Sequence, residues 1–116
     1  MTNSKENVNG NVKTPFSNSS DPAFLAVKGN FENKDDAKAY VKDLAKAVFV
    51  VFQKLNTAKL RCIGAASLNN AIKATIIASG EAKKKSLNFA IVPSFTTVQF
   101  DGGEDRTAVV LEVVKI

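Results

Sequence analysis

A strand, a small-residue turn and a helix follow one another in residues 59–80, which read KLRCIGAASLNNAIKATIIASG. The short apolar run Lys59–Ile63 predicts a strand, and the small residues Gly64-Ala65-Ala66 predict the turn that closes it. Ser67 is the expected N-cap of the following helix and Gly80 its expected C-terminal cap. Between them, apolar residues recur at helical steps: Leu68, Ala71, Ile72, Thr75 and Ile76. This segment therefore predicts a strand that passes directly into a helix.

The same two patterns occur upstream of this segment. Phe24–Val27 is a short apolar run that predicts a first strand. From Lys34 to Leu55 the apolar residues recur every three or four positions, which predicts a helix of about six turns. Asn33 is its expected N-cap and Asn56 its expected stop.

Downstream, the pattern becomes that of paired strands. Apolar residues alternate with others over Leu87–Phe95, and Pro93 predicts an interruption, a bulge or an edge position because proline donates no ladder hydrogen bond. Asp101-Gly102-Gly103 predicts a hairpin turn. The last strand, Thr107–Ile116, is apolar on both faces, so we expect helices to cover one face and a second subunit to cover the other. The order predicts an α/β two-layer sandwich, β-α-β-α-β-β, with a mixed four-stranded sheet and two helices.

Length and composition set the domain organisation. A chain of 116 residues is long enough for one domain and too short for two separate cores. Residues 1–22 are rich in asparagine and serine and predict a disordered leader, so the folded domain is expected over residues 23–116. No apolar run is long enough to cross a bilayer and no signal peptide is visible, so we expect a cytoplasmic protein without membrane association.

The cysteine and histidine counts exclude most familiar catalytic chemistry. Cys62 is the single cysteine and the chain has no histidine, so an internal disulfide, a Cys/His zinc site and a histidine-based catalytic triad are all excluded. Cys62 lies within a predicted strand, which favours a buried small apolar residue over a nucleophile. We expect no catalytic residue, no metal site and no cofactor.

The charge suggests a polyanionic partner or simply a soluble basic surface. The net charge is +5, and residues 1–22 contribute nothing to it because their charges cancel. Lys83, Lys84 and Lys85 form one basic cluster, whereas Asp101, Glu104 and Asp105 form an acidic patch. Along the first helix, lysines alternate with aspartates in a pattern typical of a solvated face: Lys34, Lys38, Lys42 and Lys46.

The turn and helix start at residues 64–73 predict an anion site. Unpaired N–H groups of a first helical turn and the helix dipole attract anions, and small residues let a phosphate come close. The segment lacks both the P-loop pattern and the Gly-x-Gly-x-x-Gly pattern, so nucleotide hydrolysis is not indicated. An alternative stays open, in which the small residues only allow the strand and helix to pack closely. The candidate phosphate contacts are Arg61, Gly64, Ala65, Ala66, Ser67, Asn69, Asn70, Lys73, Lys83, Lys84 and Lys85.

Two blocks of sequence resemble a known family. They are Ile63–Ala74 and a second block made of Pro93–Thr96, Gln99, Asp101-Gly102 and Arg106–Ala108, and together they resemble the stage V sporulation protein S (SpoVS) family, which is grouped with the Alba-like nucleic-acid-binding folds. The resemblance implies an Alba-like domain that forms a dimer or higher oligomer, binds nucleic acid and acts as a regulator in sporulation.

Two functions follow as hypotheses. In the first, a non-enzymatic homodimer binds the phosphates of DNA or RNA at the start of the second helix. In the alternative, the protein is an oligomeric protein-interaction or scaffold module without nucleic-acid binding, and its basic charge serves solubility. Arg106 follows Glu104 and Asp105, which favours an ion pair within the chain over a phosphate contact.

Overall fold

Six elements make up the part of the chain that the computed structural model describes, residues 21–99 and 102–116. They follow in the order β1 (Phe24–Val27), α1 (Lys34–Leu55), β2 (Thr57–Cys62), α2 (Ala65–Lys83), β3 (Phe89–Gln99) and β4 (Asp105–Lys115). This order confirms the predicted β-α-β-α-β-β arrangement. Of the predicted leader, all but Asp21 and Pro22 lies outside the described residues, as does Asp101 of the predicted hairpin turn and acidic patch.

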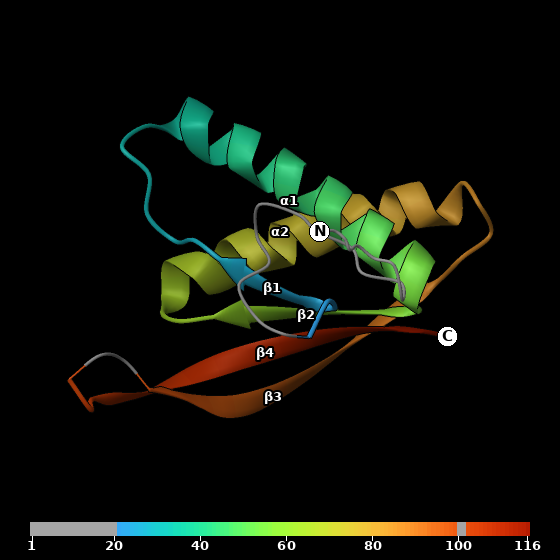
Figure 1. Ribbon diagram of the computed structural model, residues 1–116. Helices are drawn as coiled ribbons and strands as arrows, with labels where there is room; N and C mark the ends of the chain where they lie inside the picture. The colour runs from blue at the N-terminus through green and yellow to red at the C-terminus, as the bar shows by residue number, and fades with distance from the viewer. Residues whose placement is uncertain (1–20, 100–101) are drawn as a thin grey trace, which may run out of the picture.

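The four strands form one mixed sheet in the order β1-β2-β4-β3. β1 and β2 are parallel, and α1 is the crossover between them, whereas β4 runs antiparallel to both β2 and β3. Both helices lie on the same face of the sheet, so the protein is the predicted two-layer sandwich (Figure 1). No helix in residues 21–99 or 102–116 is long and apolar enough to cross a membrane.

The core lies between the two layers and follows from the two periodicities. Every second residue of β2 is buried toward the helices, namely Ala58, Leu60 and Cys62. α1 supplies large side chains such as Phe52, whose ring meets the Phe89 ring edge-on with centroids 4.5 Å apart. α2 supplies small ones, Ala71, Ala74 and Ala78, all fully buried. Small residues on α2 allow this helix to lie close to α1 and the sheet.

The ends of α1 confirm the sequence prediction. The Asn33 side chain accepts a hydrogen bond from the Asp36 backbone N–H at 2.8 Å, which is the geometry of an N-cap. Asn56 ends the helix in the left-handed conformation, with φ of 61°, and its N–H donates to the Phe52 carbonyl.

The ends of α2 differ from the prediction. Gly64, not Ser67, is the N-cap, because the Ser67 hydroxyl lies inside the first turn and donates to the Ile63 and Gly64 carbonyls at 2.9 and 3.0 Å. Gly80 does not end the helix, which continues to Lys83 because the next turn still buries Ala82 completely. Burial of this additional turn outweighs the helix-breaking tendency of glycine. Lys83, predicted in the connection after the helix, therefore lies within its last turn.

β3 runs unbroken through Pro93. Of the three alternatives for this proline, the edge position is confirmed, since β3 lies at the edge of the sheet and β4 is its one neighbouring strand. An edge strand tolerates proline because one of its sides donates no ladder hydrogen bonds.

β4 lies inside the sheet, and residues from both of its faces are buried, including Val110 and Leu111. The exposed apolar residues lie instead on β3, where Phe95 is 80% exposed. Beyond the end of β2, β4 pairs only with β3, through the ladder that joins Ala108 to Thr96 and Asp105 to Gln99. The β3–β4 hairpin therefore extends past the rest of the sheet as a two-stranded arm (Figure 1).

Candidate functional site

The junction between β2 and α2 is a sharp elbow formed by Gly64, Ala65 and Ala66. Gly64 has a φ of 90°, a conformation that a residue with a side chain adopts only at a cost. All three residues are exposed to solvent. The glycine thus lets β2 turn directly into α2.

The N-terminus of α2 lacks the side-chain cap and the acidic residues that the N-terminus of α1 has. In α1, Asn33 caps the first turn, and Asp35 and Asp36 place negative charge beside it. In α2, no side chain caps the helix and no acidic residue lies in the first turn. The positive end of the helix dipole is therefore not offset by an acidic residue of the first turn, and Ala65 and Ala66 there are exposed, whereas Ser67 is buried.

The loop between β1 and α1 packs directly against the elbow. A Cβ atom added to Gly29 would lie 3.0 Å from the Ser67 backbone nitrogen and 3.2 Å from the Ala66 Cβ, so only glycine fits there without displacement. The Asn70 side-chain amide donates to the carbonyls of Lys28 and Gly29, both at 3.0 Å. Asn70 was predicted as a phosphate contact, but it is 7% exposed and holds the loop.

Tyr40 of α1 anchors the same loop from the other side. Its hydroxyl oxygen accepts a hydrogen bond from the Lys28 N–H at 2.7 Å, and its ring lies 4.8 Å from that of Phe31. Burial raises the pKa of the Tyr40 hydroxyl, and the hydrogen bond from Lys28 partly opposes this shift. The Lys28 ammonium lies 4.7 Å from the centroid of the Phe31 ring. Lys28 thus lies on the loop that packs against the elbow, and sequence reasoning missed it, although a Lys-Gly pair directly after a strand is a visible signal.

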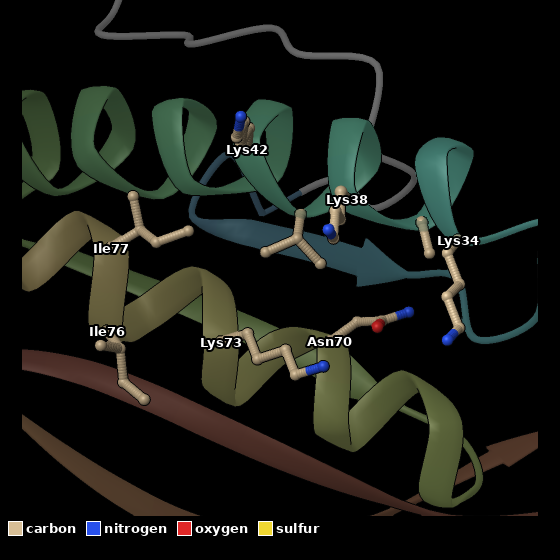
Figure 2. A pocket seen from close by; sticks show the side chains of 9 residues that line it. Lys34, Lys38, Lys42, Asn70, Lys73, Ile76 and Ile77 are labelled. Carbon is tan, nitrogen blue, oxygen red and sulfur yellow. The ribbon is translucent and has the colours of Figure 1, made fainter.

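A groove between α1 and α2 carries four more lysines (Figure 2). Its volume is about 580 Å³, and its walls include Lys34, Lys38 and Lys42 from α1 and Lys73 from α2. Lys73, predicted as a phosphate contact, lies one turn beyond Asn70, about 12 Å along α2 from Ala65 at 1.5 Å per residue. The three α1 lysines were predicted on a solvated face; they are exposed, and they also line one wall of the groove. Their periodic spacing was the visible signal.

The remaining predicted contacts lie elsewhere. Lys83, Lys84 and Lys85 follow the other end of α2, about 27 Å from the elbow at 1.5 Å per residue, and Lys84 pairs with Glu81 at 3.0 Å. Arg61 lies between the buried Leu60 and Cys62 on β2, so its side chain leaves the opposite face of the sheet. The Arg61 Nε atom is buried there without a hydrogen-bond partner. The structure therefore groups the elbow, Asn69 and Lys73, but not Arg61 or the lysine cluster.

Two further residues have the surroundings that the sequence predicted. Arg106 lies in ion-pair range of Glu104, with 3.8 Å between Nε and Oε1. Cys62 is 1% exposed, and its burial raises the pKa of the thiol to about 11, so it is a neutral buried group at physiological pH. Within the described ranges, no three side chains of the metal-binding types gather into a possible metal site.

The comparison with protein families agrees with the two sequence blocks. The chain matches the family model described as stage V sporulation protein S (SpoVS) over residues 32–116. This match covers well over half of the chain, including α1, the elbow, α2 and the β3–β4 hairpin. The chain therefore belongs to the stage V sporulation protein S family.

Proposed function

We propose that this protein is a non-enzymatic regulatory protein that binds the sugar-phosphate backbone of nucleic acid at the elbow. The observation that carries the proposal is the exposed start of α2, which has neither a side-chain cap nor an acidic residue. The cations that we assign to the site are Lys73, further along α2, and Lys28, on the loop that Asn70 holds. Such a site holds a phosphate through backbone amides and nearby charge.

The surface around the elbow is better suited to contacts with the sugar-phosphate backbone of a nucleic acid than to recognition of its bases. Sequence-tolerant stacking needs exposed aromatic rings, but Phe31, the aromatic residue of the β1–α1 loop, is in contact with Tyr40 and Lys28. The available groups are amides and ammonium ions, which recognise phosphate charge. We therefore expect binding with little sequence preference and a strong dependence on salt.

The proposal includes a homodimer, which would double the number of phosphate contacts. Apolar surface near β3 supports it: Phe95 on β3 is 80% exposed, and Ile76 on the adjacent side of α2 is 65% exposed. A recess of about 390 Å³ between α2 and β3 is lined in part by Ile76, Phe89 and Ile91. Exposed apolar residues of this kind commonly lie at a subunit interface.

A binding titration with random-sequence nucleic acid tests the proposal. Fluorescence anisotropy at 50 mM salt, with a labelled 20-base-pair DNA duplex and with a labelled single-stranded RNA, should show saturable binding to at least one of them. Light scattering on the same sample should give the mass of a dimer or a higher oligomer. An oligomer that binds neither nucleic acid would contradict the proposal and favour a protein-interaction module.

A further inference from the structure

The groove between α1 and α2 combines cationic walls with an apolar floor. We name it the lysine groove, after Lys34, Lys38 and Lys42 on one wall and Lys73 on the other. Figure 2 shows these side chains around the groove, with Ile76 and Ile77 on the α2 side. Val41 closes the floor between the helices and is buried, whereas Ile76 and Ile77 are 65% and 42% exposed. Two branched apolar side chains of α2 thus stay open to solvent, Ile77 on the side toward α1 and Ile76 pointing away from α1 (Figure 2).

Within the part of the chain that the structure describes, the lysines of the groove have no ion-pair partner. None of its four lysines forms an ion pair with any residue in 21–99 or 102–116, and no carboxylate is among the groove's lining residues. Elsewhere on the surface, basic side chains do have acidic neighbours, as in the pairs Lys59–Asp21 and Lys84–Glu81. The groove therefore complements a ligand that is both acidic and apolar.

The spacing of the groove matches a helix. Lys34, Lys38 and Lys42 follow at successive turns of α1, so they span about 12 Å, the length of two helical turns. An amphipathic helix that binds in a groove presents apolar residues at positions i, i+3, i+4 and i+7. Acidic residues beside such a stripe would lie next to the lysine walls, while the stripe itself would cover Ile77.

We propose that the lysine groove binds an acidic amphipathic helix of a partner protein. Nucleic acid is a poorer fit, because the floor is aliphatic and offers neither an aromatic ring nor a hydrogen-bond donor to a base. The chain's own residues 1–20 are also a poorer fit, since they contain two lysines, Lys5 and Lys13, against one acid, Glu6. Lys73 belongs both to this groove and to the proposed phosphate site, so the variants below leave Lys73 unchanged, and their failure is distinguishable from a failure of the proposed nucleic-acid binding.

Synthetic peptides and the full chain provide the test. The probe is a labelled 16-residue helical peptide with leucines at i, i+3, i+4 and i+7 and glutamates on both flanks. A scrambled peptide of the same composition removes the stripe, and a third peptide carries lysine in place of each glutamate. At 150 mM salt, where charges are screened beyond about 8 Å, the acidic amphipathic peptide should bind at least tenfold more tightly than either control.

Two pairs of variants locate the binding. The double variant Lys38→Glu with Lys42→Glu should bind the acidic peptide at least tenfold more weakly. Its matched control, Lys46→Glu with Lys54→Glu, makes the same charge change on the same helix outside the groove and should alter affinity less than threefold. For the floor, Ile77→Ser should weaken binding at least fivefold, whereas Val50→Ser, at an exposed position of α1 outside the groove, should not. Circular dichroism checks that each variant is folded. If Ile77→Ser does not fold, the comparison of the two lysine variants decides the test.

Three results would overturn the proposal. The first is equal affinity for the acidic and scrambled peptides, and the second is an equal loss in the groove variant and its matched control. The third concerns random duplex DNA. If Lys38→Glu with Lys42→Glu removes DNA binding while the folded Ile77→Ser variant binds the peptide normally, the groove is a general polyanion surface and not a helix site.

Discussion

Two adjacent asparagines, Asn69 and Asn70, show how burial separates residues that look alike in the sequence. Both follow the elbow in the first turns of α2, and both were predicted as phosphate contacts. Asn69 is exposed, whereas Asn70 is buried and donates to two carbonyls of the β1–α1 loop, more than 40 positions earlier in the chain. The sequence cannot separate them, because the distinction depends on where that loop packs.

Alanine substitution should separate the two asparagines experimentally. Asn70→Ala leaves two loop carbonyls without their donor and should lower the free energy of unfolding by about 1–3 kcal/mol. Asn69→Ala is the matched control and should change it by less than about 0.5 kcal/mol. Urea denaturation measures both. Equal effects would mean that Asn70 does not hold the loop.

Cys62 should make the stability of the protein depend on pH in the alkaline range. Its pKa is raised from 9.0 in the unfolded chain to about 11 in the fold, because burial disfavours the thiolate. The native state therefore binds more protons between these values, so the stabilisation is present below pH 9 and is lost as the pH rises through 11. The difference amounts to roughly 2–3 kcal/mol.

The Cys62→Ala variant isolates this contribution from those of lysine and tyrosine. Urea denaturation of both proteins at several pH values between 8 and 11 should show that the free energy of unfolding falls more steeply with pH for the native sequence than for the variant. The thiol should also react slowly with Ellman's reagent at pH 8 until the protein unfolds. Fast reaction of the folded protein would show that Cys62 is not buried.

The two helices differ in how far the sequence determines their ends. α1 follows its local signals, since Asn33 and Asn56 occupy the cap positions that their residue types favour. α2 does not, because Ser67 bonds backward to carbonyls and the turn after Gly80 is stabilised by burial of Ala82. Periodicity predicted both helices, whereas the caps of α2 depend on contacts with the sheet and loop.

Gly80 provides a test of this account of α2. It lies in the helix interior, and a Cβ added there would have no atom within 4 Å. Gly80→Ala should therefore raise the free energy of unfolding by about 0.5–1 kcal/mol, through the higher helix propensity of alanine. Gly64→Ala, at a φ of 90°, should lower it instead, by about 1–2 kcal/mol. Thermal denaturation of both variants checks the opposite signs.

The candidate site was also predictable only in part. The elbow, Asn69 and Lys73 were visible because they are contiguous in the sequence and share one local structure. Lys28 was not, because it reaches the elbow through the β1–α1–β2 crossover. Lys83–Lys85 are separated from the elbow by the full length of α2. The predicted end at Gly80 made this helix too short.

At the scale of the whole molecule, the topology determines which end carries the candidate site. Both helices begin on the side of the sheet where the elbow lies (Figure 1). α1 neutralises its own N-terminus with Asp35 and Asp36, so the uncompensated end belongs to α2. The lysine groove begins beside it, at Lys34 and Asn70, and the β3–β4 arm extends on the same side (Figures 1 and 2). The acidic and basic residues of the arm pair with each other at Glu104 and Arg106.

The salt dependence of nucleic-acid binding tests the central claim most directly. If a dimer makes about six phosphate contacts, the affinity for random duplex DNA should fall about a thousandfold between 50 and 200 mM salt. Lys73→Ala should reduce the slope of log affinity against log salt by about two, one for each subunit. Lys54→Ala, at the far end of α1, should leave the slope unchanged. A slope that stays flat in the native protein, or that Lys73→Ala and Lys54→Ala alter equally, would contradict phosphate binding at the elbow.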